Sequence, residues 1–223
     1  MRKVVMRKDS RDLPLTHKKP NGDYFKVLSI DGKYVPTKEY IYWTSAKHRT
    51  KTPYKLRFPS YEVVGFDQTI QDFNLFVEWC HKQVGFSYRG YVMDKDILGV
   101  VCGYKNYSTE TCVFIPARIN AFLISKNKAV KHYTGVSFQQ ECQKYIVSCS
   151  QLNGKNKTLA RVNCPVEGYN IYKAEKVRLA KVLAAEYEGK VDRRVTDILS
   201  NFENYIDLFT VNPTNKETIN AQK

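Results

Sequence analysis

The chain has 223 residues, of which 43% are hydrophobic, 13% aromatic and 26% charged, as in ordinary globular proteins. This composition excludes wholesale disorder, and no apolar run approaches the roughly 20 residues of a transmembrane helix. The formal net charge is +14, and residues 1–60 hold 15 basic against 5 acidic side chains. Such an excess favours a polyanionic partner, and nucleic acid is the leading class.

The N-terminus begins with basic residues, but no apolar region follows them, so we expect no secretion signal, no membrane attachment and a cytoplasmic location. The six cysteines form no C-x-x-C pair and are predicted to be reduced thiols. Zinc is disfavoured because the cysteine spacing lacks paired ligands.

Residues 1–83 are predicted to form a basic region with an aromatic helix. Turn signals and alternation indicate, in chain order, a strand, its hairpin partner, a short helix and an exposed basic loop, at 24–30, 33–35, 38–47 and 47–53. Apolar residues at helical spacing predict an amphipathic helix over 69–81, with Thr69 as its cap.

Residues 84–124 are predicted to form a strand at 91–98, a loop, a second strand at 111–116 and a helix ending at Leu123. Asp94, Lys95 and Asp96 lie midway along the first strand, Asn106 lies in the loop, and Asn120 lies on the helix. Carboxylate and amide oxygens suit a hard cation such as Mg²⁺. On spacing alone, the favoured interpretation is the alternative, that Asp94 and Asp96 are solvated strand residues and Asn120 is a helix terminus.

The stretch from Tyr91 to Leu123 resembles the HNH endonuclease family, in particular its phage-encoded homing branch, at positions 92–97, 106–116 and 119–120. The resemblance implies a ββα-metal fold in which Asp94 and Asn120 hold one Mg²⁺ or Mn²⁺ ion and Asn106 braces the loop. It also implies hydrolysis of phosphodiester bonds in double-stranded DNA. We expect a monomer, which would cut one strand at a time.

Lys95 stands where that family has the histidine that deprotonates the attacking water. A lysine is protonated at neutral pH, so Lys95 is expected to stabilise charge on the phosphate, while Asp96, His81 or His132 takes the proton. The alternative is a catalytically inactive DNA-binding protein, with a regulatory or structural role in a phage, that has kept the fold.

Residues 133–190 are predicted to form antiparallel strands at 135–138, 144–150 and 158–162, followed by a helix from Pro165 to near Gly189. A linker precedes them at 125–133. Residues 191–223 are predicted to form one last helix, running towards Phe209, and a disordered tail. The expected fold class is α+β: a ββα-metal nuclease core, then a three-stranded antiparallel sheet packed on a helix.

The stretch from Thr134 to Lys176 resembles the DNA-binding domain of plant ethylene-response factors, at 135–137, 145–149, 153–155 and 159–160. In that domain the sheet lies in the major groove. Alternation along the strands makes five outward residues candidate base contacts: Ser137, Ser148, Ser150, Asn156 and Thr158. Four basic residues are candidate phosphate contacts: Lys144, Lys155, Lys157 and Arg161. The alternative is that the serines are merely solvated.

Overall fold

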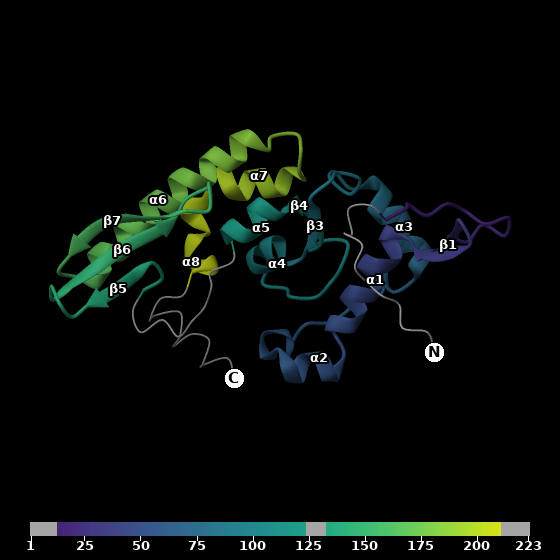
Figure 1. The fold of residues 1–223 in the computed structure, drawn as a ribbon, viewed down its shortest axis with the longest axis horizontal. Coiled ribbons are helices and arrows are strands. Elements are labelled where there is room, and N and C mark those ends of the chain that lie inside the picture. The colour runs from purple at the N-terminus through teal and green to yellow at the C-terminus, as the bar shows by residue number, and fades with distance from the viewer. Residues whose placement is uncertain (1–12, 124–132, 211–223) are drawn as a thin grey trace. The chain divides into compact units, whose positions relative to one another are not determined.

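The computed structural model describes residues 13–123 and 133–210 (Figure 1). The chain divides into two compact units, Met1–Phe114 and Ile115–Lys223. Each unit is described by itself. The predicted linker up to His132, the predicted tail and residues 1–12 lie outside the described residues. Within the described residues, no helix has the length and apolar character needed to cross a membrane.

The first unit begins with the predicted hairpin, in which β1 (Val27–Ile30) pairs antiparallel with β2 (Lys33–Pro36). Helix α1 (Lys38–Arg49) follows, and the Thr37 side chain caps it by accepting the Tyr40 N–H. Both predictions are confirmed. The exposed loop predicted at 47–53 is wrong at both ends, because α1 continues to Arg49 and α2 (Thr52–Arg57) begins with Pro53 in its first turn. Proline suits that position because its φ is already helical.

Helix α3 (Phe73–Lys82) packs its predicted apolar face into the core of this unit. Its cap is Asp72, whose carboxylate accepts the Leu75 N–H at 3.0 Å. The predicted cap, Thr69, lies instead in a preceding 3₁₀ turn (Gln68–Ile70), where Asp67 accepts its N–H at 2.9 Å. The core joins α1, α3 and the later strands through these buried side chains: Ala46, Val64, Ile70, Phe76, Cys80, Phe86, Tyr107, Cys112 and Phe114.

The strand predicted at 91–98 is wrong beyond its midpoint. β3 (Tyr91–Asp94) ends at Asp94, and α4 (Asp96–Cys102) begins two residues later. Asp94 causes the switch, because its Oδ1 accepts the N–H groups of Asp96 and Ile97, both at 2.9 Å, as a helix cap does. β4 (Val113–Pro116) pairs with β3, and α5 (Ala117–Leu123) follows it, both as predicted. The order is strand, helix, strand, helix, so the ββα-metal core stays a proposal.

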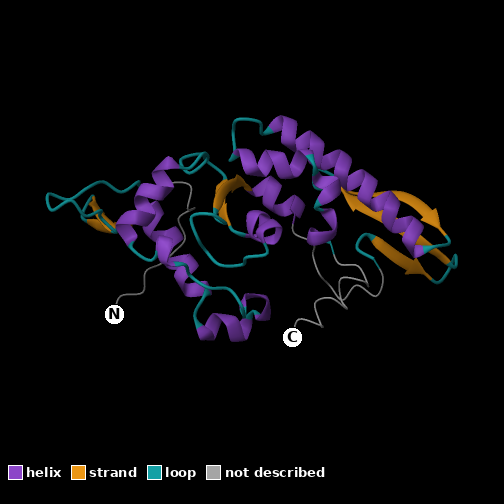
Figure 2. Cartoon of the chain, turned by 180° about the vertical axis from the view of Figure 1, so that it is seen from behind, coloured by secondary structure: helices purple, strands orange, loops and turns teal. Residues whose placement is uncertain are grey.

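The second unit contains the predicted three-stranded antiparallel sheet, in the order β5 (Val136–Gln139), β6 (Lys144–Ser150) and β7 (Asn156–Val162). Helix α6 (Pro165–Glu186) lies along one face of it, as predicted (Figure 2). The close approach depends on Gly168, because a Cβ there would lie 3.0 to 3.4 Å from valine side chains of all three strands. Gly135, at φ +79°, would place a Cβ 2.1 Å from the Tyr172 ring.

The single C-terminal helix of the prediction is wrong. The segment divides into α7 (Arg193–Ser200), a 3₁₀ turn (Phe202–Asn204) and α8 (Ile206–Phe209). The break lies at Asn201, whose side-chain Nδ2 donates to the Asp197 carbonyl at 2.9 Å and so competes with the helical backbone. The apolar side chains of this segment are nevertheless buried: Val195, Ile198, Leu199, Phe202 and Ile206.

Candidate functional site

Asp94 lies at the carboxyl end of β3, and its side chain is 9% exposed. Its Oδ1 is occupied by the two backbone N–H groups of α4. Burial raises the pKa of Asp94 to about 6, although those hydrogen bonds act in the opposite direction. The carboxyl group therefore changes its charge close to neutral pH, which is typical of groups that bind a cation or move a proton.

Lys95 is buried, whereas its neighbour Asp96 is largely exposed. The Lys95 ammonium pairs with the Asp96 carboxylate, and it lies 5.3 Å from the Tyr61 ring centroid and 5.5 Å from that of Tyr107. Aromatic faces attract a cation, so the two rings and the carboxylate hold the Lys95 side chain in this place. The Asp96 carboxylate also faces water.

Arg49, at the end of α1, is a second cation beside these rings. Its Nη1 donates to the Tyr107 hydroxyl at 3.2 Å. Tyr107 is 1% exposed, and burial raises its pKa well above the ordinary value, so it stays a neutral phenol. Lys95 and Arg49 therefore share one buried ring, and we call Arg49, Tyr61, Asp94, Lys95, Asp96 and Tyr107 the Asp94 cluster.

Asn106 lies in the loop between α4 and β4, as predicted. Its Oδ1 accepts the Gly65 N–H at 2.6 Å, and a Cβ at Gly65 would lie only 2.7 Å from that oxygen. Its backbone carbonyl accepts the Thr111 hydroxyl at 2.6 Å. Asn106 thus fastens the loop to the Gly65 segment, and the role that the resemblance implies for it stays a prediction.

Asn120 lies half-buried on α5, in the second unit, whereas Asp94 lies in the first. Their convergence on one cation stays a prediction. His81 is occupied elsewhere, because its Nε2 lies 2.7 Å from Oε1 of the buried Glu39. Among the described residues, no group of three or more His, Cys, Asp or Glu side chains is arranged to hold a metal ion.

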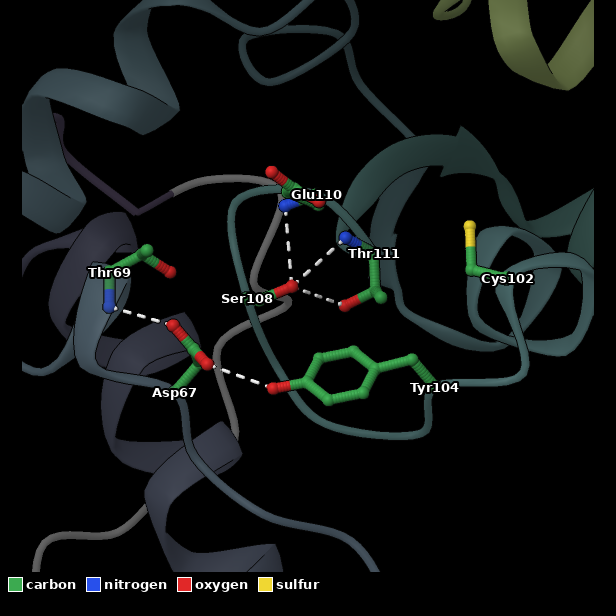
Figure 3. A pocket seen from close by; sticks show the side chains of 7 residues that line it. All are labelled: Asp67, Thr69, Cys102, Tyr104, Ser108, Glu110 and Thr111. Atoms are coloured by element: carbon green, nitrogen blue, oxygen red, sulfur yellow. Dashed lines mark hydrogen bonds between the residues drawn. The ribbon is translucent and has the colours of Figure 1, made fainter.

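A polar pocket of about 420 Å³ opens beside the loop that carries Asn106 (Figure 3). Most of its polar groups bond to one another. Asp67 accepts the Thr69 N–H and, at 2.9 Å, the Tyr104 hydroxyl, and these bonds lower the pKa of its carboxyl group. Ser108 Oγ accepts the N–H groups of Glu110 and Thr111 at 3.3 and 3.1 Å. The hydrogen bonds that line the pocket therefore hold the loop that carries Asn106 in place.

The face of the sheet opposite α6 carries all five predicted base contacts. Residues directly opposite each other in an antiparallel pair point to the same side. Val136, Val147 and Val162 face α6, so the other parity faces away from it. We call this set the outer face: Ser137, Gln139, Lys144, Ile146, Ser148, Ser150, Asn156, Thr158 and Arg161. All of them are exposed except Ile146 and Ser148, which are half-buried.

A β-bulge decides which residues of β7 belong to the outer face. Val147 pairs with Ala160 and Ser148 pairs with Thr158, so Leu159 is an extra residue on β7. Strict alternation from Arg161 would turn Thr158 towards the helix. The bulge restores Thr158 and Asn156 to the side of Arg161, because one additional residue inverts the alternation beyond it.

The four predicted phosphate contacts lie in three different parts of the second unit. Lys144 and Arg161 lie on the outer face. Lys157 pairs with Cys149, which is buried, and therefore points to the side of α6. Lys155 lies in the turn between β6 and β7, where the Gln151 N–H donates to its carbonyl at 2.8 Å.

Several residues of these sites were missed from the sequence. Ile146 could have been found by counting alternate positions from Lys144, and Gln139 by counting from Ser137. Arg49, Tyr61 and Tyr107 could not, because they come from three separate segments that only the packed core brings together. Comparisons with protein-family models, with curated proteins and with solved structures found no match. Both family resemblances therefore stay predictions.

Proposed function

We propose that the protein binds double-stranded DNA through the outer face of its sheet. The observation that carries this proposal is a solvent-facing row of small polar side chains flanked by Lys144 and Arg161 and stiffened from behind by α6. Residues 133–164 contain four basic side chains and one acidic side chain, that of Glu141. Strands can enter the major groove, where short hydroxyl and amide groups reach the edges of bases.

Three matched alanine variants test this proposal. Lys144→Ala and Arg161→Ala should each weaken duplex DNA binding and lower the salt slope of the affinity by about one, since each removes one phosphate contact. Lys157→Ala is the control, because it removes the same charge from the opposite side of the same sheet. Equal losses in all three variants, or an affinity that ignores salt, would contradict binding through the outer face.

A second candidate function is hydrolysis of a phosphodiester bond at the Asp94 cluster. It is favoured by a carboxyl group with a pKa of about 6 next to the buried Lys95, with Arg49 on the same tyrosine. Lys95 and Arg49 would bind the phosphate and stabilise its charge. The exposed Asp96 carboxylate would take the proton of the attacking water.

The oxygen ligands fit Mg²⁺ or Mn²⁺. Magnesium sites in proteins use one or two carboxylates together with water and substrate phosphate, so the Asp94 carboxylate is a ligand of the right chemical type. A bound ion of this kind supplies charge stabilisation for the phosphate and the leaving oxygen. A closed zinc site needs four protein ligands, and the described residues offer no such group.

Incubation with supercoiled plasmid and Mg²⁺ or Mn²⁺ tests this activity. Wild-type protein should nick the plasmid, while Asp94→Ala and Asn120→Ala should not. Equal activity of all three proteins would reject the mechanism. DNA binding with no nicking by any of them would leave the inactive DNA-binding protein as the function.

A further inference from the structure

The segment from Tyr40 to Tyr61 holds five Lys or Arg residues and no acidic residue. It comprises most of α1, the whole of α2 and the 3₁₀ turn Pro59–Tyr61. Figure 1 shows α2 at the far end of α1, away from α3 and the β1 hairpin. No residue of α2 is buried. The segment therefore presents positive charge on a projecting helix.

Leu56 is the apolar side chain that this helix exposes most. It is 79% exposed and lies between Lys55 and Arg57. Exposing a leucine to water is unfavourable relative to burying it. An apolar side chain with a cation on each side of it in the sequence is suited to an apolar space next to negative charge.

The same segment is fixed to the Asp94 cluster by aromatic contacts. The Tyr54 ring lies 5.1 Å from the Tyr61 ring and 4.6 Å from the Phe58 ring, and Lys95 lies over Tyr61. Arg49 leads into α2 and bonds to Tyr107. A DNA backbone bound at Lys95 and Arg49 would therefore bring its neighbouring groove to Leu56.

We infer that α2 inserts Leu56 between two base pairs from the minor groove, next to the phosphate that the Asp94 cluster binds. Proteins that enter the minor groove commonly use an apolar wedge flanked by Lys or Arg, which unstacks one base step and kinks the duplex. The inference rests on the proposed DNA binding but concerns a surface separate from the sheet. The inference gives α2 the role of distorting the bound DNA.

The experiment measures unwinding rather than cleavage. Closed circular plasmid is relaxed by a metal-independent topoisomerase in EDTA with saturating full-length protein, and the topoisomers are compared after protein removal. Wild-type protein should shift the linking number, and Leu56→Ala should give about half of that shift or less, because the wedge is gone. Each protein is used at saturation, so that a difference in plasmid affinity does not enter the comparison.

Two further variants make the result specific. Leu56→Met keeps an apolar side chain of similar size and should keep the shift. Val63→Ala is the matched control, because Val63 is also exposed, at 67%, but lies outside the basic segment. An equal shift with Leu56→Ala and wild type, or no shift by bound wild type, overturns the wedge and leaves the DNA-binding proposal intact. No plasmid binding at all overturns both.

Anionic membranes are the competing partner of a basic, apolar tip. Vesicles of phosphatidylserine and phosphatidylcholine test it directly. Vesicle binding that Leu56→Ala abolishes, with an unchanged plasmid shift, would assign the tip to lipid and overturn the inference. Failure of wild-type protein to bind the vesicles, together with a plasmid shift that depends on Leu56, supports it.

Discussion

The Asp94 cluster and the outer face hold polar side chains in opposite ways. In the cluster, Asp94 and Lys95 are almost completely buried and engaged by hydrogen bonds, an ion pair and aromatic rings. On the outer face, hydroxyl and amide groups stand exposed on a regular sheet. Burial shifts the pKa of a charged group and restricts its position, whereas exposure leaves a group free to match a ligand. The cluster is suited to chemistry and the face to recognition.

The largest effect that would test this division is at Asp94. Asp94→Asn keeps an oxygen for the N–H groups of Asp96 and Ile97 but removes the negative charge. Plasmid nicking should fall by about 10³-fold, as for loss of a group that stabilises the transition state, while DNA affinity changes less than about twofold. A parallel loss of affinity would show that the cluster also recognises DNA.

Lys176 is a buried charge with no carboxylate partner within residues 13–123 and 133–210, and it sharpens the contrast with Lys95. Its Nζ donates to the Phe122 carbonyl at 2.6 Å and lies 3.5 Å from the centroid of the Phe122 ring. Burial lowers the pKa of Lys176 to about 8. Between about pH 8 and pH 10.5 the unfolded chain therefore binds more protons, so stability rises with pH, by about 3 kcal/mol in total.

Denaturant unfolding of wild type and Lys176→Met across that pH range measures this effect. The free energy of unfolding of the wild type, relative to that of Lys176→Met, should rise with pH as the wild-type lysine loses its proton. Lys173→Met is the control, because Lys173 lies on the same helix in a more exposed ion pair with Asp207. A pH-independent difference for Lys176→Met would show that its ammonium is not desolvated.

The next effect concerns the ionised form of Asp94. The Mg²⁺ concentration that gives half-maximal nicking should rise about tenfold for each pH unit below about 6 and level off above it, because protons compete with the metal ion for the Asp94 carboxylate and burial raises the pKa of the metal-free group to about 6. Single-turnover nicking at a series of Mg²⁺ concentrations between about pH 5 and pH 8 measures this profile. A flat profile would exclude Asp94 as the titrating group.

The smallest effect is expected on the outer face. Ser148→Ala removes one hydroxyl group and should reduce the affinity for a preferred sequence by at most about 1 kcal/mol, while binding to random DNA stays unchanged. Binding of selected and random duplexes at fixed salt measures the difference. An equal loss on both duplexes would show that Ser148 contacts phosphate rather than bases.

The sequence predicts the second unit better than the first. Alternation, Asn153-Gly154 and Pro165 are local signals, and they correctly place the three strands, the turn and α6. The change from strand to helix after Asp94 could not be predicted from such local signals, because Ile97 and Leu98 are compatible with a strand and with a short helix alike. The hydrogen bonds of one carboxylate decide between them. Likewise, the partners of Lys95 depend on tertiary packing.

The extra residue at Leu159 lets β7 lose one residue without reversing its faces. Leu159 has no partner of its own on β6, so its deletion would place Thr158 directly after Ala160, and regular alternation would keep Thr158 and Asn156 on the outer face. Regular pairing of Leu159 with Ser148 would instead turn Thr158 and Asn156 towards α6 and bring Lys157 to the outside. The chemical groups that this strand offers to solvent are therefore set by where the irregularity lies, and not by the order of residues alone.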